Sequence, residues 1–199
     1  MGLARLKTVV SAFFLITLSA CVSFPGAPPA EFAPRFEEDG FHSIDGAVLG
    51  LQSWRADNPR AIVVALHGMN DYSHMYDDPA QFWAEKGVTT YAIDQRGFGR
   101  SPEFGHWVGE ETMIADVRAA VAAARRMHPG LPVFVIGHSM GAGVILAAEA
   151  QAPLGADGIV LAAPGVWGGA ALPVPYRLSA NIAATFAPGK TLTGERAER

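Results

Sequence analysis

The sequence contains a single cysteine, Cys21, among its 199 residues. One cysteine can form neither a disulfide within the chain nor a metal site built from several thiolates. Charged residues are also few, at 17% of the total, and the formal net charge of -4 comes without any block of basic residues. Nothing therefore indicates a nucleic-acid partner. Half of the residues are hydrophobic, which is enough to bury the core of one domain.

The N-terminal segment lacks an apolar run long enough to cross a bilayer as a helix. Arg5 and Lys7 precede a mostly apolar stretch at 9–18, a pattern typical of a secretory signal peptide. The tetrapeptide Leu-Ser-Ala-Cys that ends at Cys21 resembles the bacterial lipobox, whose cysteine is lipidated. We therefore expect a lipoprotein signal peptide at 1–20 and a lipid on Cys21. An ordinary cleaved signal beside a chance cysteine is the alternative.

Residues 21–38 are rich in proline and fit an extended tether between a membrane and a domain. A lipid at Cys21 would anchor the protein to a membrane of the bacterial cell envelope. The residue after the cysteine is Val22 and not an aspartate, and this favours the outer membrane if the host sorts its lipoproteins as Gram-negative bacteria do.

Apolar, β-branched runs alternate with helix-like segments along the middle of the chain. The runs predicted to be strands are 61–68, 88–94, 131–137 and 157–165, and the predicted helices between them are 77–87, 110–130 and 140–151. Such alternation predicts an α/β fold of βαβ units, with a mostly parallel sheet and helices on both faces. Upstream, Asp45-Gly46 between two alternating arms predicts a hairpin.

The alternation stops after Gly165, and residues 166–199 are rich in glycine and proline. Apolar residues four apart in this segment predict one amphipathic helix; they are Val174, Leu178, Ile182 and Phe186. Because no further strand is predicted, the strand at 157–165 should leave an open apolar edge on the sheet. Such an edge is an aggregation hazard.

Residues 137–141, Gly-His-Ser-Met-Gly, match the pattern Gly-x-Ser-x-Gly between a predicted buried strand and a predicted helix. A sharp turn in this setting holds the serine in a strained conformation, and the chain packs so closely that Gly137 and Gly141 must lack side chains. Ser139 is therefore a candidate nucleophile. These glycines and Gly143 do not spell a phosphate loop, because no Lys-Ser or Lys-Thr pair follows them. We predict no cofactor and no metal site.

Together with two other segments, this motif resembles the α/β-hydrolase fold, and within it the monoacylglycerol lipase and lysophospholipase-like (serine aminopeptidase-like) branch. The segments are LHGMNDYS (66–73), DQRGFGRS (94–101) and GHSMGAG (137–143), in the order and spacing of that family. The resemblance implies that 39–165 form the N-terminal part of the hydrolase core and that 166–199 begin a cap. It also implies hydrolysis of carboxylic esters, with lipid-like substrates such as monoacylglycerols or lysophospholipids.

The resemblance further assigns roles to individual residues. Ser139 corresponds to the nucleophile that forms an acyl-enzyme. The backbone N–H groups of Met69 and Met140 correspond to the two donors of an oxyanion hole. His67 is implied to be a packing element rather than a base, and Asp94 is implied to shape a loop rather than to act as the triad acid.

A serine nucleophile needs a histidine base and a carboxylate that orients the histidine, and in this fold both follow the serine in the chain. All six histidines precede Ser139. Either the chain is the incomplete part of a longer hydrolase, which we favour, or an upstream histidine has become the base. We expect the 199-residue chain alone to be inactive. The competing function is a catalytically inactive envelope lipoprotein that uses the scaffold for binding or structure.

Overall fold

The computed structural model describes residues 26–166 and 173–186. The chain divides into two compact units, and Phe24–Val166 is the larger one. The predicted signal peptide, Cys21 and the last part of the predicted cap (187–199) lie outside the described residues. In the described part of the chain, no helix is long and apolar enough to span a membrane.

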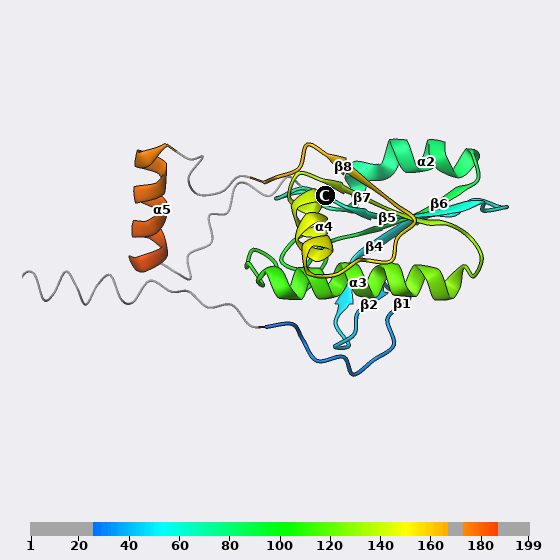
Figure 1. The fold of residues 1–199 in the computed structure, drawn as a ribbon, viewed down its shortest axis with the longest axis horizontal. Helices are drawn as coiled ribbons and strands as arrows, with labels where there is room; N and C mark the ends of the chain where they lie inside the picture. The colour runs from blue at the N-terminus through cyan, green and yellow to red at the C-terminus, as the bar shows by residue number, and fades with distance from the viewer. Residues whose placement is uncertain (1–25, 167–172, 187–199) are drawn as a thin grey trace, which may run out of the picture. The chain divides into compact units, whose positions relative to one another are not determined.

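The larger unit is built on a five-stranded sheet with the order β4-β6-β5-β7-β8 (Figure 1). Its strands are β4 (Leu51–Trp54), β5 (Ala61–Leu66), β6 (Val88–Ile93), β7 (Val133–His138) and β8 (Gly158–Ala162). The pairs between β6, β5, β7 and β8 are parallel, whereas β4 runs antiparallel to β6. These pairs confirm the mostly parallel sheet predicted from the sequence. The prediction succeeded because continuous β-branched runs suit strands that are covered on both faces.

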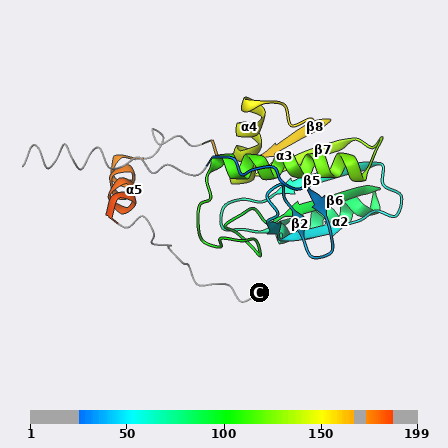
Figure 2. The same cartoon turned by 90° about the horizontal axis from the view of Figure 1, so that it is seen from below.

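Helices cover both faces of this sheet, as predicted. The helical elements of the larger unit are the short 3-10 helix η1 (Ser73–Tyr76), α2 (Asp77–Glu85), α3 (Glu110–Met127) and α4 (Met140–Gln151). Val63 and Ala65 of β5 face the α2 side, and Ile62 and Val64 face α3 and α4. Figures 1 and 2 show α2 and α3 on opposite sides of the sheet. Alternation along β5 therefore divides the core into two apolar layers.

A small antiparallel sheet, β1-β2-β3, packs into the layer of α3. Its strands are β1 (Arg35–Phe36), β2 (Phe41–His42) and β3 (Val48–Leu49). β2 and β3 form the hairpin predicted around Asp45-Gly46. The second arm of that hairpin is split, since Leu51–Trp54 leave it for the main sheet. Gly50 lies at the break, where a Cβ would come within 2.3 Å of an Asp94 carboxylate oxygen.

The core begins earlier than the sequence predicted. Residues 31–36 fall inside the predicted tether (21–38), yet they belong to the larger unit. Phe36 is buried, and its ring stacks on Tyr91 with 4.3 Å between ring centroids. The Pro34 carbonyl accepts a hydrogen bond from Arg126. The prolines of this stretch suggested a tether, but the aromatic residue among them contributes a core contact.

The second unit includes the helix α5 (Val174–Phe186), which confirms the amphipathic helix predicted from spacing. The four apolar residues that define the spacing are all exposed: Val174, Leu178, Ile182 and Phe186.

β8 is an edge strand of the described sheet, and it presents three exposed apolar side chains, those of Ile159, Val160 and Leu161. The open apolar edge expected from the sequence is therefore present. Unpaired backbone groups beside apolar side chains form a template for a further strand.

Replacing Val160 with lysine should reduce self-association, because an edge lysine opposes the addition of another strand. We expect Val160→Lys to remain monomeric at several-fold higher protein concentration, measured by size-exclusion chromatography with light scattering. Leu146→Lys is the control, since Leu146 is also apolar and exposed but lies on α4. An equal improvement in both variants would attribute the effect to added charge rather than to the edge.

Candidate active site

Ser139 lies between the last residue of β7 and the first residue of α4. Its φ of 49° and ψ of -109° place it in a backbone region that residues with side chains rarely adopt. Serine is a preferred N-cap residue, but the Ser139 side chain makes no capping hydrogen bond. The strained turn therefore presents the hydroxyl without using it to satisfy the helix.

Backbone hydrogen bonds to β8 and the loop after it hold Ser139 in this conformation. Its N–H donates to the Ala162 carbonyl at 2.9 Å, and its own carbonyl accepts from the Gly165 N–H at 2.8 Å. Ala163, between these partners, also has a positive φ, 45°. The surrounding structure thus fixes a strained serine, an arrangement that clusters at functional sites. The sequence did not predict this support, because the loop after β8 carries no motif of its own.

The two elbow glycines occupy positions where a side chain would not fit. A Cβ on Gly137 would lie 2.5 Å from the Ala142 nitrogen. On Gly141 it would lie 2.6 Å from the Leu66 carbonyl oxygen and 2.7 Å from that of His67. The close approach that the Gly-x-Ser-x-Gly pattern requires is therefore a property of this turn.

The two predicted oxyanion donors belong to the elbow itself and to the turn after β5 that packs against it. Met140 begins α4, so its N–H has no acceptor within the helix and lies at the positive end of the helix dipole. Met69 follows the His67-Gly68 turn at the end of β5. A Cβ on Gly68 would lie 3.4 Å from the Ser139 Cβ, so this turn packs against the elbow. The oxyanion role of both N–H groups remains a prediction.

His67 is fully buried, and both of its ring nitrogens are engaged. Nδ1 lies 2.6 Å from the Gly68 carbonyl oxygen, and the Gln95 backbone N–H donates to Nε2 at 2.8 Å. Burial lowers the pKa of the ring and keeps it neutral, with the proton on Nδ1. The structure confirms the predicted packing role and leaves neither nitrogen for Ser139.

Asp94 is fully buried and organises the loop that follows β6. Its carboxylate accepts hydrogen bonds from the backbone N–H groups of Ser73, at 2.7 Å, and Arg100, at 2.9 Å. Burial alone would raise the pKa of Asp94, but these donors outweigh it and hold the pKa below its ordinary value of 3.8. A Cβ on Gly99 would lie 2.4 Å from this carboxyl group. Asp94 therefore shapes the loop, as expected.

Asp94→Asn tests this assignment through its pH dependence. A lowered folded-state pKa means that ionised Asp94 stabilises the fold above the unfolded pKa and that this contribution is lost as the pH falls through the folded pKa. We expect the variant to lose about 1–3 kcal/mol of unfolding free energy at pH 7. The difference from wild type should narrow below pH ~4. Urea unfolding at several pH values measures it, with the exposed Asp57→Asn as control. A difference that stays constant with pH would indicate a steric effect instead.

The structure brings no base to Ser139 within residues 26–166 and 173–186. All six histidines lie in this part of the chain, and none donates to or accepts from the Ser139 hydroxyl. Hydrogen-bond partners are Arg35 and Asp39 for His42, Gly68 and Gln95 for His67, and Tyr91 for His128. His138 directs a buried, unpartnered Nδ1 toward Gly68, where a Cβ would lie 3.0 Å away. The described geometry gives no support to an upstream histidine as base.

A buried ion network, which the sequence did not reveal, joins the hairpin turn to α3. The Arg96 guanidinium binds the Asp116 carboxylate at 2.7 and 2.9 Å and the Asp45 carboxylate at 2.7 and 2.8 Å. The Ser43 hydroxyl donates to Asp116 at 2.5 Å. These residues are far apart in sequence, so spacing could not identify them as partners.

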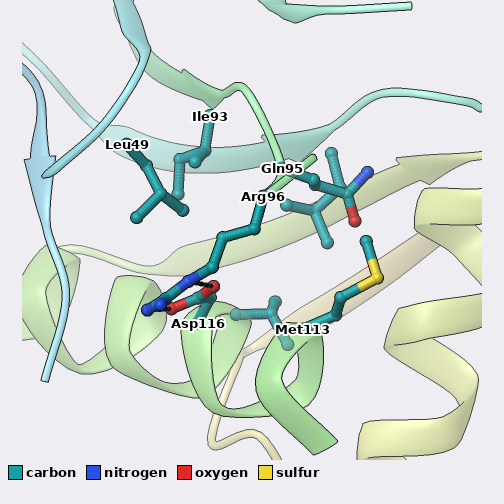
Figure 3. A pocket seen from close by; sticks show the side chains of 8 residues that line it. Leu49, Ile93, Gln95, Arg96, Met113 and Asp116 are labelled. Atoms are coloured by element: carbon teal, nitrogen blue, oxygen red, sulfur yellow. Dashed lines mark hydrogen bonds and ion pairs between the residues drawn. The ribbon is translucent and has the colours of Figure 1, made fainter. Parts of the chain in front are cut away.

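A small cavity of about 10 Å³ lies beside this network (Figure 3). Leu49, Ile93 and Met113 contribute apolar side chains to its wall. This volume suits about one water molecule. The cavity is therefore too small to be a substrate site.

Residues 57–198 match the family described as serine aminopeptidase, S33. The chain belongs to this family. It is 35% identical over 131 residues to the monoacylglycerol lipase of Mycolicibacterium smegmatis. This match covers 65% of this chain and 47% of that lipase. It is 32% identical over 116 residues to the phospholipase YtpA of Bacillus subtilis, covering 57% of this chain and 44% of that protein. The chain thus spans about half the length of the curated relatives that it matches.

A solved structure supports the fold. A soluble variant of monoglyceride lipase from Saccharomyces cerevisiae superposes with a TM-score of 0.58 at 22% identity, over 82% of this chain and 56% of that one. The serine aminopeptidase S33 chain described here therefore has an α/β-hydrolase fold, as the three sequence segments predicted.

Proposed function

We propose that this chain carries the nucleophile and the oxyanion donors of a serine hydrolase that cleaves carboxylic esters. The observation that supports the proposal is the strained Ser139, whose hydroxyl makes no capping bond and whose backbone is held from two sides. Such strain is retained where the surrounding structure overdetermines it, most often at functional sites.

In the proposed reaction, the Ser139 oxygen attacks the ester carbonyl carbon, and a base accepts the hydroxyl proton. The negative charge on the carbonyl oxygen is stabilised by the N–H groups of Met69 and Met140. The same proton is returned to the alcohol as it leaves, and water then hydrolyses the acyl-enzyme. The chain contains no histidine after Ser139, so we propose that the chain alone does not complete this cycle.

We propose a lipid-like ester as substrate, in particular a monoacylglycerol or a lysophospholipid. The relatives named a monoacylglycerol lipase and a phospholipase support this class. A lipid on Cys21 in the bacterial envelope, at the outer membrane, is part of the same proposal, because it would place the enzyme beside such substrates.

A second candidate is a catalytically inactive envelope lipoprotein that uses the hydrolase scaffold for binding or structure. It is favoured by the lack of a histidine hydrogen-bonded to Ser139 in the described residues.

Sequencing the gene beyond codon 199 and expressing its complete product separates the two candidates. For the enzyme, we expect a continuation that encodes an aspartate and a histidine, and hydrolysis of p-nitrophenyl butyrate that Ser139→Ala abolishes. A gene that stops at Arg199, with a product that shows no such hydrolysis, would favour the binding protein.

A further inference from the structure

The His67 carbonyl connects the two segments that carry the proposed oxyanion donors. This oxygen accepts a hydrogen bond from the Gly141 N–H at 3.2 Å. Met69 lies two residues after His67, and Met140 lies one residue before Gly141. The separation of the two donor N–H groups therefore depends on where this carbonyl is held.

Gln95 holds His67 at two points. Its backbone N–H donates to Nε2 of the His67 ring, and its side-chain NH₂ donates to the His67 carbonyl, both at 2.8 Å. The ring bond fixes the side chain, and the amide bond fixes the peptide plane that leads into the Gly68 turn. Figure 3 shows the Gln95 side chain directed away from the neighbouring Arg96, so it does not serve the ion network.

The other end of the Gln95 amide has no partner in the described residues. Its Oε1 is buried and unpaired, and the residue is 5% exposed. Gln95 also lines the small cavity, which has room for about one water molecule, and among the described protein groups it is the His67 carbonyl that orients its amide. Rotating the amide would place Oε1 against the His67 carbonyl oxygen, where two acceptors would repel. The donor orientation is therefore the one that the site selects.

We propose that Gln95 is a positioning residue of the oxyanion hole: through the His67 carbonyl, it fixes the turn that carries Met69 against the first turn of α4. This rests on the proposed function, because it assigns a purpose to the spacing of the two N–H groups. Gln95 does not touch the reacting atoms. It acts on the geometry of groups that do, and small displacements of oxyanion donors weaken their effect on the transition state.

Gln95→Met tests the proposal, because methionine keeps the length of the side chain and the backbone donor but lacks the amide N–H. Thr90→Val is the matched control: Thr90 is on β6, fully buried, and its hydroxyl is also unpaired. Hydrogen exchange of the Gly141 amide reports on its bond to His67. We expect exchange about tenfold faster in Gln95→Met, with no change in Thr90→Val. Slower exchange would mean that Gln95 competes with the Gly141 N–H for the His67 carbonyl. Unchanged exchange would mean that Gln95 does not affect this bond. Either result would overturn the proposal.

A second measurement follows the reaction itself. A fluorophosphonate is incubated with the full chain and added imidazole, which serves as external base. The Ser139 oxygen bonds to phosphorus, fluoride leaves, and imidazole takes the proton. We expect Gln95→Met to label about tenfold more slowly and Thr90→Val to label like wild type. Equal rates would contradict the positioning role. If no variant is labelled at Ser139, the proposed function fails and the oxyanion role of Gln95 fails with it, whereas labelling of wild type at the same rate as Gln95→Met overturns the role of Gln95 alone.

Discussion

Gly141→Ala and Gly143→Ala are expected to change stability in opposite directions, although both positions lie in the first turns of α4. At Gly141 the new Cβ would lie 2.6 and 2.7 Å from two backbone oxygens of the turn after β5, and neither can move without moving the elbow. Overpacking of this kind costs about 1–3 kcal/mol. At Gly143 the nearest atom is the Gly165 oxygen at 3.4 Å, an ordinary contact. Alanine there should add up to about 1 kcal/mol through helix propensity.

Thermal unfolding measures both effects, with a shift of about 2–4 °C per kcal/mol for a chain of this size. Gly141→Ala should melt several degrees below wild type, and Gly143→Ala slightly above it. Two alanines with the same effect would mean that Gly141 does not pack against the His67 turn as described.

Arg96→Met is expected to cause the largest loss of stability. Arg96 is buried, and hydrogen bonds from it lower the pKa of Asp45. Burial disfavours the charge on Arg96, but the bonds to Asp45 and Asp116 raise its pKa, so the guanidinium stays charged. Removing it leaves Asp116 buried without its cationic partner. Breaking one partner of a buried ion pair costs about 3–5 kcal/mol.

Urea unfolding at pH 7 tests this, with Arg125→Met as the control. Arg125 pairs with Asp157 at 2.9 Å, but their side chains are 42% and 44% exposed. An exposed pair contributes less than about 1 kcal/mol, so this variant should unfold nearly like wild type. A similarly small loss for Arg96→Met would show that the hairpin does not depend on the network.

The elements of the core could be predicted from local patterns. The strands at 61–66 and 88–93 are continuous β-branched runs, and α3 has apolar spacing with Glu110 and Glu111 in its first turn and arginines in its last. These signals depend on near neighbours in the sequence and on the helix dipole. β1 was missed because two residues are too few to show alternation, and its place is fixed by stacking of Phe36 on Tyr91.

The candidate site likewise has a part that local sequence patterns predict and a part that depends on contacts between distant residues. The Gly-x-Ser-x-Gly pattern located Ser139 because the turn excludes side chains two residues before and two residues after it. Gln95 belongs to the segment DQRGFGRS (94–101). Its contact with His67 joins residues 28 apart in the sequence, and no local pattern predicts such a contact. The clamp of Ser139 by Ala162 and Gly165 is likewise made by backbone groups, which any residue type supplies.

We propose above all that Ser139 is a formed nucleophile that residues 1–199 do not activate. Intact-mass analysis after fluorophosphonate treatment, with and without imidazole, tests it most directly, and Ser139→Ala gives the background. We expect labelling at Ser139 only when imidazole is present. Equal labelling without imidazole would contradict the claim, because it would mean that a group within the chain already acts as the base. No labelling under either condition would also contradict it, because Ser139 would then not be a nucleophile.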